Sequence, residues 1–243
     1  MPNFSSNIKQ QKSTLLKYFA ELLVVVFGVF LGFMANDYAQ KLNQQDYVNI
    51  TIKGMYNNLA LDISDAEINL KGHKDGLESI NYFIKILKGE AVKLDSFNLH
   101  HHRFARSFIS VQNTSQFETI RSKGFNVIKD DSLRKQMIKL YDFEYEVLEK
   151  IEEKYQESQI YANEYHPIIS ILGKSMVFDK NLQLIKIKNP LPISNDEKSY
   201  LILIFKRLHL TRNFNIKVYE NAIKEMKALR TNIAKVYPFV LKQ

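Results

Sequence analysis

The hydrophobic residues of this chain form one continuous run near the N-terminus and a regular repeat beyond it. Every residue of Leu22–Ala35 is apolar or glycine, with Tyr18 before the run and Tyr38 after it. A helix that crosses a membrane needs about 20 mainly apolar residues, and aromatic rings favour the membrane interfaces. A buried core helix would show a polar face, which this run lacks. The pattern therefore predicts a transmembrane helix over residues 18–38.

A cleaved signal peptide is the alternative for this segment. Cleavage requires small residues just before the cut. Ala35 could be the last residue removed, but Phe33 two positions earlier is bulky, and Ala39 has Asp37 in that place. An uncleaved anchor fits the sequence better.

Beyond residue 38, apolar residues recur in steps of four and three, the spacing of a long amphipathic helix. Gly89 follows Lys85 and Lys88, an arrangement typical of a helix C-terminus. The repeat predicts one helix that ends at Lys88 and is either straight or bent near Gly72 and Gly76. Its stripe contains Tyr38, Leu42, Ile52, Tyr56, Leu59, Ile63, Ala66, Leu70, His73, Leu77, Ile80, Ile84 and Leu87.

Capping residues and a proline set the limits of the next helices. Ser115 and Glu118 have the spacing of a capping box, which predicts a short helix that Gly124 closes. Asp131 is expected to cap a second long helix, and Pro167 to bend or end it. The apolar stripe of that helix contains Leu133, Met137, Leu140, Val147, Ile151 and Tyr155.

The remaining segments are connectors and one last helix. For residues 90–113 the sequence predicts a connector with one short helix. For residues 177–193 it predicts an irregular segment with a short hairpin at residues 182–187. Ser194–Glu197 is a second capping box, and Pro238 ends the helix that follows it.

Three long apolar stripes without alternating strands predict an all-α protein. Its N-terminal transmembrane helix is expected to continue into an antiparallel helical bundle with long helices. The expected divisions are a short cytoplasmic tail (residues 1–17), the transmembrane helix (residues 18–38) and an extracytoplasmic bundle domain (residues 39–243). The low glycine and proline counts, 8 and 5, agree with long helices.

The charges beside the span predict its orientation. Lysines without any acid precede it and acids follow it: Lys9, Lys12 and Lys17 come before, and Asp37, Lys41 and Asp46 after. Basic flanks stay on the cytoplasmic side. We therefore expect a bacterial inner (cytoplasmic) membrane, with the N-terminus in the cytoplasm and the C-terminal domain in the periplasm.

The net charge of +8 admits two kinds of anionic partner, lipid and nucleic acid. The basic residues are spread along the chain rather than massed, so membrane lipid is an expected partner and nucleic acid is not. The absence of cysteine excludes disulfides, a thiol nucleophile and cysteine-based metal sites.

Three residues of the span are candidates for association with a second membrane helix. Gly28 and Gly32 form a GxxxG pattern, which lets two helix backbones approach closely, although glycine is also simply frequent in membrane helices. Glu21 is costly inside lipid, so it either reaches the headgroups, paired with Lys17, or contacts a partner helix. We predict a homodimer or a partner membrane protein.

Candidate chemistry outside the span is sparse. His100–His102, with Asp95 upstream, is the one cluster of metal-type ligands, but consecutive side chains do not point one way. We expect a solvated loop there, and no metal, no cofactor and no catalytic residue in the chain; metal binding by this cluster stays open. His73 is expected to be a buried neutral histidine with a hydrogen-bond partner, or else a pH-sensitive core contact.

Two further patterns predict residues that lie on the protein surface. The carboxylates between Glu144 and Glu157 alternate with lysines and indicate a solvated helix face rather than an acid–base pair. Aromatic residues and arginines favour protein interfaces. The candidates for a partner surface are Arg121, Arg134, Tyr141 and Tyr145.

Two stretches of the chain resemble a family of uncharacterised single-pass bacterial inner-membrane proteins. The first is Lys17–Glu21 with Leu22–Ala35 and Asn36–Tyr38; the second is Phe117–Gly124 with Val127–Asp130, Ser132–Arg134 and Leu140–Asp142. Tyr38 stands where tryptophan is usual, and Phe125 departs from the family pattern after Gly124. The resemblance implies a Glu/Gly-containing transmembrane helix and a helical exterior domain, and it implies no activity and no functional residue.

Phe19–Val26 is also similar to the start of a type IV pilin, in which a glutamate in an apolar helix guides assembly. Pilins carry a glycine before the processed residue, whereas no glycine precedes Gly28 here, and their heads are rich in sheet. We therefore do not expect a pilin-like role.

The sequence leaves three functions in competition. The first is a non-catalytic, membrane-anchored helical bundle for protein–protein assembly or scaffolding, and the second is an extracytoplasmic sensor that signals through a partner membrane protein. A pocket lined by aromatic residues and arginine would favour the sensor, and a closed core would not. The third, an enzyme, needs converging polar groups that the sequence does not show.

Overall fold

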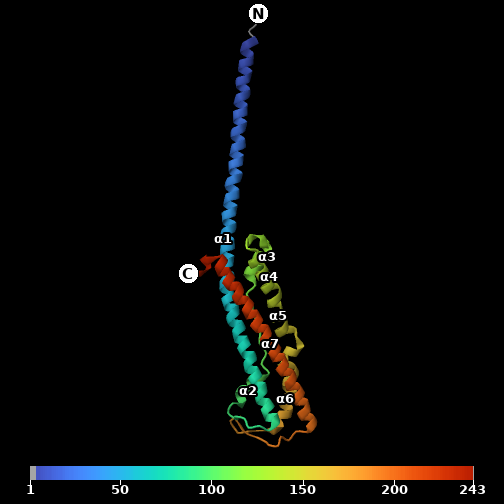
Figure 1. Cartoon of the computed structure of the whole chain (residues 1–243). Helices are drawn as coiled ribbons and strands as arrows, with labels where there is room; N and C mark the ends of the chain where they lie inside the picture. The colour runs from blue at the N-terminus through green and yellow to red at the C-terminus, as the bar shows by residue number, and fades with distance from the viewer. Residues whose placement is uncertain (1–3, 243) are drawn as a thin grey trace. The chain divides into compact units, whose positions relative to one another are not determined.

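The computed structural model describes residues 4–242, with side chains from residue 17 onward except at Ala20. The chain divides into two units, residues 1–50 and residues 51–243. The helix α1 (Phe4–Lys88) belongs to both (Figure 1). The later elements are α2 (Phe97–Phe104), α3 (Ser115–Lys123), η1 (Phe125–Val127), α4 (Asp131–Lys139), η2 (Leu140–Glu144), α5 (Tyr145–Glu149), η3 (Lys150–Lys154), η4 (Gln156–Ser158), α6 (Ile160–Leu172), η5 (Gly173–Ser175), β1 (Met176–Phe178), β2 (Leu184–Ile187), α7 (Asn195–Val236) and η6 (Pro238–Leu241).

In the first unit, α1 contains one segment that is long and apolar enough to cross a membrane. Its 18-residue window has a mean hydropathy of 2.2, and none of that window is buried. Phe27 and Phe33, for example, are 61% and 70% exposed. A large exposed apolar surface is typical of segments that contact a membrane or a partner.

The second unit is a bundle of long helical rods, which confirms the all-α prediction (Figure 1). Polar contacts join α1 to α7 in reverse order: Tyr56 to Arg230, Glu67 to Lys227 and Lys74 to Glu220. The helix α7 is therefore antiparallel to α1. The rod from α4 to α6 runs parallel to α1, because an extended connector over residues 105–114 returns the chain along α1.

The bundle core is apolar at both ends and polar in the middle. On α1 the buried positions include a series that alternates in steps of three and four: Ile52, Met55, Leu59, Asp62, Ala66, Asn69, His73, Gly76, Ile80, Phe83 and Leu87. The positions buried beside this series include Thr51, Ser79, Tyr82 and Ile86. Every second position of the predicted stripe beyond Ile52 belongs to the series. The stripe was wrong at Tyr56, Ile63, Leu70, Leu77 and Ile84, which are only partly buried, and at Tyr38 and Leu42, which are exposed. The core positions that alternate with its correct members are Met55, Asp62, Asn69, Gly76 and Phe83, of which Asp62 and Asn69 are polar.

The helix α1 is continuous past Gly72 and Gly76, so neither glycine marks a bend. Both allow close packing instead. A methyl group at Gly72 would collide with the ring of Phe108, and one at Gly76 would lie 3.0 Å from Nε of Arg212. The absent side chains therefore make room for the Phe108 ring and for the Arg212 guanidinium.

The predicted helix limits were right at the glycines and partly wrong at the caps. Gly89 and Gly124 have φ angles of +75° and +88° and follow the helix ends, as expected. The capping box at Ser194–Glu197 is confirmed. The box at Ser115 does not form, because Ser115 donates to the neighbouring Gln116 side chain.

The second helix also differs from its prediction. Asp130 rather than Asp131 caps it, because the Asp130 carboxylate accepts a hydrogen bond from Leu133 N at 2.7 Å. Pro167 lies inside α6, and the rod is interrupted earlier, at η4. A hairpin is present, but it begins earlier than the predicted residues 182–187: β1 at Met176–Phe178 pairs antiparallel with β2 at Leu184–Ile187.

We call the segment from α4 to α6 (residues 131–172) the second rod. Two π-helical turns, η2 and η3, rotate its buried face. A π-turn joins backbone groups that are five residues apart in the sequence, rather than four as in an α-helix. The residues that face the core therefore shift by one position. Tyr141, Tyr145 and Glu152 consequently point into the core, whereas Tyr155 is 41% exposed. A regular 3.6-residue period could not reveal this shift.

Candidate functional site

The span presents its predicted association residues on its surface. Gly28 and Gly32 lie four residues apart and therefore on one face, and a Cβ added at either would meet no atom within 4 Å. Glu21 is exposed. Among the ion pairs of the described residues none joins Lys17 to Glu21; the pair next to the span is Lys41 with Asp37, at 2.8 Å.

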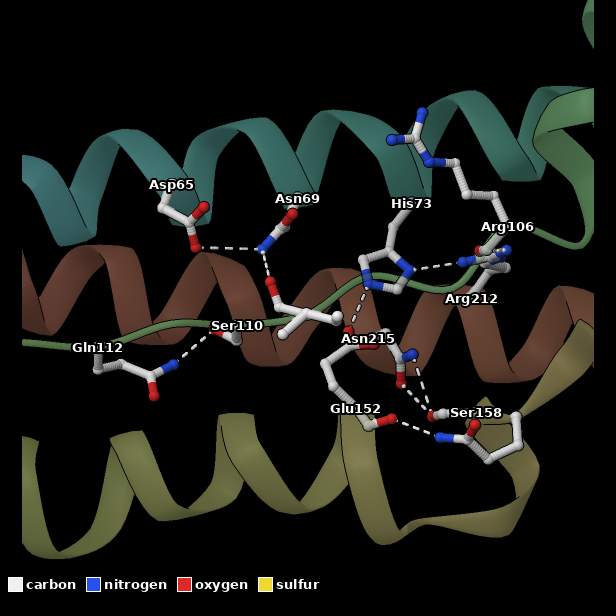
Figure 2. Close-up of polar contacts among 12 residues, drawn as sticks. Asp65, Asn69, His73, Arg106, Ser110, Gln112, Glu152, Ser158, Arg212 and Asn215 are labelled. Atoms are coloured by element: carbon white, nitrogen blue, oxygen red, sulfur yellow. Dashed lines mark hydrogen bonds and ion pairs between the residues drawn. The ribbon is translucent and has the colours of Figure 1, made fainter.

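The middle layer of the bundle brings buried polar side chains together from four segments. Figure 2 shows α1, the connector, the second rod and α7 meeting around His73. His73, Glu152 and Arg212 are each at most 5% exposed. We call these three residues the buried triad.

Hydrogen bonds fix the protonation of the buried triad. His73 Nδ1 lies 2.9 Å from Nη1 of Arg212, and His73 Nε2 lies 2.8 Å from Oε1 of Glu152 (Figure 2). A guanidinium has only donors, so Nδ1 must accept. The imidazole is therefore neutral and donates its Nε2 proton to Glu152. This confirms the prediction that His73 is buried and has a hydrogen-bond partner.

Burial and charge shift the pKa values of the triad. Burial lowers the pKa of His73 below its ordinary 6.5, although the Glu152 carboxylate opposes this and the Arg212 charge adds to it. Burial lowers the pKa of Arg212 to about 10, so the guanidinium is charged at neutral pH. Its Nη2 donates to the carbonyls of Phe104 and Arg106, at 3.2 and 2.6 Å.

A second cluster lies on α1 at Asp62. Its carboxylate accepts hydrogen bonds from Tyr145 Oη at 2.6 Å and from the backbone and side chain of Asn113 at 3.1 and 2.5 Å. Burial raises the pKa of Asp62, and these hydrogen bonds oppose the rise. Asn69 donates to the carbonyl of Ile109 at 3.0 Å. Asp62 and Asn69 thereby hold the connector against α1.

The acidic residues of the second rod are not all on a solvated face. Glu144 and Glu152 are buried, because the two π-turns direct them inward. Glu144 accepts a hydrogen bond from Asn221 at 2.8 Å. Ser158 and Asn215 also bond to each other in the interior. The expectation of a fully solvated acidic face was wrong at these positions.

The histidine cluster lies on the helix α2 rather than in a loop, and its side chains diverge. His100 stacks on Tyr82 at 4.2 Å between ring centroids, whereas His101 Nε2 lies 3.1 Å from Tyr165 Oη. His102 lines a surface hollow described below. Among the described residues no group of three His, Asp or Glu side chains could hold a metal ion.

Of the predicted partner surface, Arg121 is exposed, Arg134 is half-buried, and the two tyrosines are buried. Arg121 bonds to Glu118 and Asp142 on the surface, and Arg134 pairs with Asp131 at 2.8 Å. Tyr141 and Tyr145 are only 6% and 3% exposed, because η2 turns them into the core. These two rings are therefore core residues and not part of an exposed surface.

A hollow of about 480 Å³ opens between the end of α2 and the start of α6. Arg106, Tyr161 and Tyr165 line it, together with His101 and His102. None of the described residues that line it is acidic. The hollow is separate from the closed polar layer, but the carbonyl of Arg106 accepts a hydrogen bond from Arg212.

The sequence analysis singled out His73 but missed Asp62, Glu152 and Arg212. For two of these residues, their position in an apolar repeat could have indicated burial. Asp62 lies three residues after Leu59 in the repeat, and Arg212 lies four residues after Leu208 on the apolar face of α7. The inward position of Glu152 depends on η3, for which the sequence carried no recognisable signal.

Comparison of the chain with protein-family models, with curated protein sequences and with solved structures found no match. The resemblance to uncharacterised single-pass membrane proteins therefore stays a prediction.

We expect Glu152→Gln to destabilise the bundle. The amide keeps an acceptor for His73 but leaves the buried Arg212 guanidinium without a counter-charge. Removing one partner of a direct buried ion pair costs about 3–5 kcal/mol. We expect a loss no larger than this, because His73 lies between Glu152 and Arg212. Urea unfolding of the detergent-solubilised chain, followed by circular dichroism, measures the loss. Glu153→Gln is the matched control, since Glu153 is exposed. Equal stability of the two variants would contradict the structural role of the triad.

We also expect the stability to fall in acid through His73. Its folded pKa lies below the ordinary 6.5, so between these values the unfolded chain binds a proton that the folded chain does not. The contribution is complete above pH 6.5 and is lost as the pH falls through the folded pKa. Urea unfolding at about pH 7.5 and about pH 5.5 measures the change.

The control for this pH dependence uses two variants. His73→Gln should reduce the difference between the two pH values, whereas His166→Gln, at an exposed position, should leave it unchanged. The interpretation fails if both variants keep the pH dependence of the wild type.

Proposed function

We propose that this chain is a membrane-anchored helical-bundle protein that acts in protein–protein assembly and has no catalytic activity. The observation that carries the proposal is the open glycine face of the span at Gly28 and Gly32. In lipid, such small-residue faces allow close helix packing, which drives association between membrane helices. The occupant is a second copy of the chain or the span of another membrane protein.

The chemistry of the bundle supports an assembly function over catalysis. The triad and the Asp62 cluster bond to groups of the chain itself, and they lie in the interior. Catalysis requires polar groups that converge on a space a substrate can enter. The buried groups instead join α1, the connector, the second rod and α7 to one another.

Ligand sensing is the second candidate function, and the hollow between α2 and α6 favours it. Its lining of arginine and aromatic rings is of the kind that binds small molecules. A sensor of this kind would act through a partner membrane protein. Both candidates therefore require association at the membrane.

We propose that the bundle is periplasmic and that the chain lies in a bacterial inner membrane. The lysines before the span support this orientation. The chain has no cysteine, so Lys180→Cys adds a single thiol to the bundle. In spheroplasts this thiol should react with a membrane-impermeant maleimide. Protection until the membrane is permeabilised would reverse the orientation.

Substitutions on the glycine face test the association itself. Gly28→Ala and Gly32→Ala each add one carbon to that face, and we expect the pair to lower the yield of crosslinked complexes in native membranes by about half or more. Val26→Ile also adds one carbon, but toward the opposite side of the helix, and should leave the yield unchanged. An unchanged yield in the double variant would contradict association through this face.

A further inference from the structure

The hollow between α2 and α6 has the size of a small-molecule site. Its volume of about 480 Å³ lies within the range of about 300–1,000 Å³ that is typical of ligand pockets. Ala105 and Ala162 line it with small side chains, which keeps it open. The hollow therefore has room for a ligand larger than a single ion.

One wall of the hollow is a stack of aromatic rings that extends outward from the core. Phe104 is fully buried and stacks on Tyr165, at 5.8 Å between centroids and an interplanar angle of 18°. Tyr165 in turn stacks on Tyr161 at 4.6 Å and 25°. His101 Nε2 lies 3.1 Å from Tyr165 Oη and fixes the middle ring. Tyr161 is 61% exposed, so the stack ends with a ring available to a planar ligand.

Arg106 also lines the hollow and brings a positive charge to it. Arg106 is exposed, and no carboxylate pairs with it among the ion pairs of the described residues. Its guanidinium lies 5.5 Å from the centre of the Phe108 ring, which fills the space above Gly72. Its carbonyl is held by Arg212 at 2.6 Å. The backbone of Arg106 is thereby fixed, and its side chain rests against the Phe108 ring.

We infer that this hollow binds a small organic anion that carries an aromatic ring. A carboxylate would accept paired hydrogen bonds from the Arg106 guanidinium, which matches its planar geometry. The ring of the ligand would pack beside Tyr161. A positive lining without acids favours an anion over a cation or a neutral molecule of the same shape.

The lining of the hollow is also connected to the buried triad. The carbonyl of Arg106 accepts a hydrogen bond from Arg212 (Figure 2), and the side chain of Gln159, at the start of α6, donates to the carbonyl of Glu152. Arg106 lies on the connector and Tyr161 on α6. A ligand that contacts both residues would therefore link the same two segments that are already linked through Arg212 and Glu152 of the triad. The site does not depend on association of the span, so the two proposals succeed or fail separately.

Ligand-observed NMR on the full chain in nanodiscs tests the site, with empty nanodiscs as the blank. The probes are benzoate, its neutral analogue benzamide, and the non-aromatic anion cyclohexanecarboxylate. We expect saturable binding of benzoate, about tenfold weaker binding of benzamide, and weaker binding of cyclohexanecarboxylate.

Two pairs of variants locate the binding. Arg106→Gln should weaken benzoate binding about tenfold, whereas Arg121→Gln should not, although Arg121 is also an exposed arginine above a phenylalanine ring. Ala162→Leu fills the hollow without removing a polar group and should abolish binding. Ala228→Leu, at an exposed position of α7, should not.

Three results would overturn the inference. They are the absence of saturable benzoate binding, equal binding of benzoate and benzamide, and wild-type affinity in Arg106→Gln or Ala162→Leu. Circular dichroism of each variant shows that the bundle is folded. Ala162→Leu, on an exposed helix position, keeps the test valid if Arg106→Gln unfolds.

Discussion

The buried charge of Arg212 is the constraint on which the bundle core depends. An isolated charge in a protein interior costs several kcal/mol, and only paired and hydrogen-bonded groups offset that cost. Arg212 donates to the carbonyls of Phe104, at the negative end of the α2 dipole, and Arg106, and to Nδ1 of His73, which in turn donates its one N–H to Glu152. Only its Nε, among the buried nitrogens of this side chain, has no hydrogen-bond partner. Each partner comes from a different segment. The charge can be buried only when all of these segments occupy their native places.

The same requirement sets the register of the long helices. Apolar layers such as Ile52–Leu59 and Ile80–Leu87 tolerate many packings of similar energy, because Leu, Ile and Phe contacts are not directional. The polar layer between them is directional. Pairs such as Asp62 with Tyr145 and Ser158 with Asn215 form only at one offset of the helices. A sliding movement by one helical turn would leave buried polar groups without partners.

The general fold followed from the sequence because long helices leave a strong periodic signal. The end of α1 at Gly89, the capping box at Ser194 and the apolar span all express local preferences of the chain. The polar core did not follow, because an isolated Asp62 or Arg212 carries no sign of the partner that permits its burial. Tyr141 and Tyr145 were misplaced for a different reason, since the π-turn that directs them inward breaks the period on which the prediction was based.

The connector shows how the polar layer and the surface hollow depend on each other. Ile109 and Val111 are 70% and 64% exposed, so the apolar contacts of this segment come from Ala105 and from Phe108, which packs on Gly72. Hydrogen bonds to Asn69, Asp62 and Arg212 also attach it. Segments with few buried apolar contacts open at lower free energy than the rest of a domain. Arg106 lies on this segment, so any opening of the connector changes the charged lining of the hollow and removes an acceptor from Arg212 at the same time.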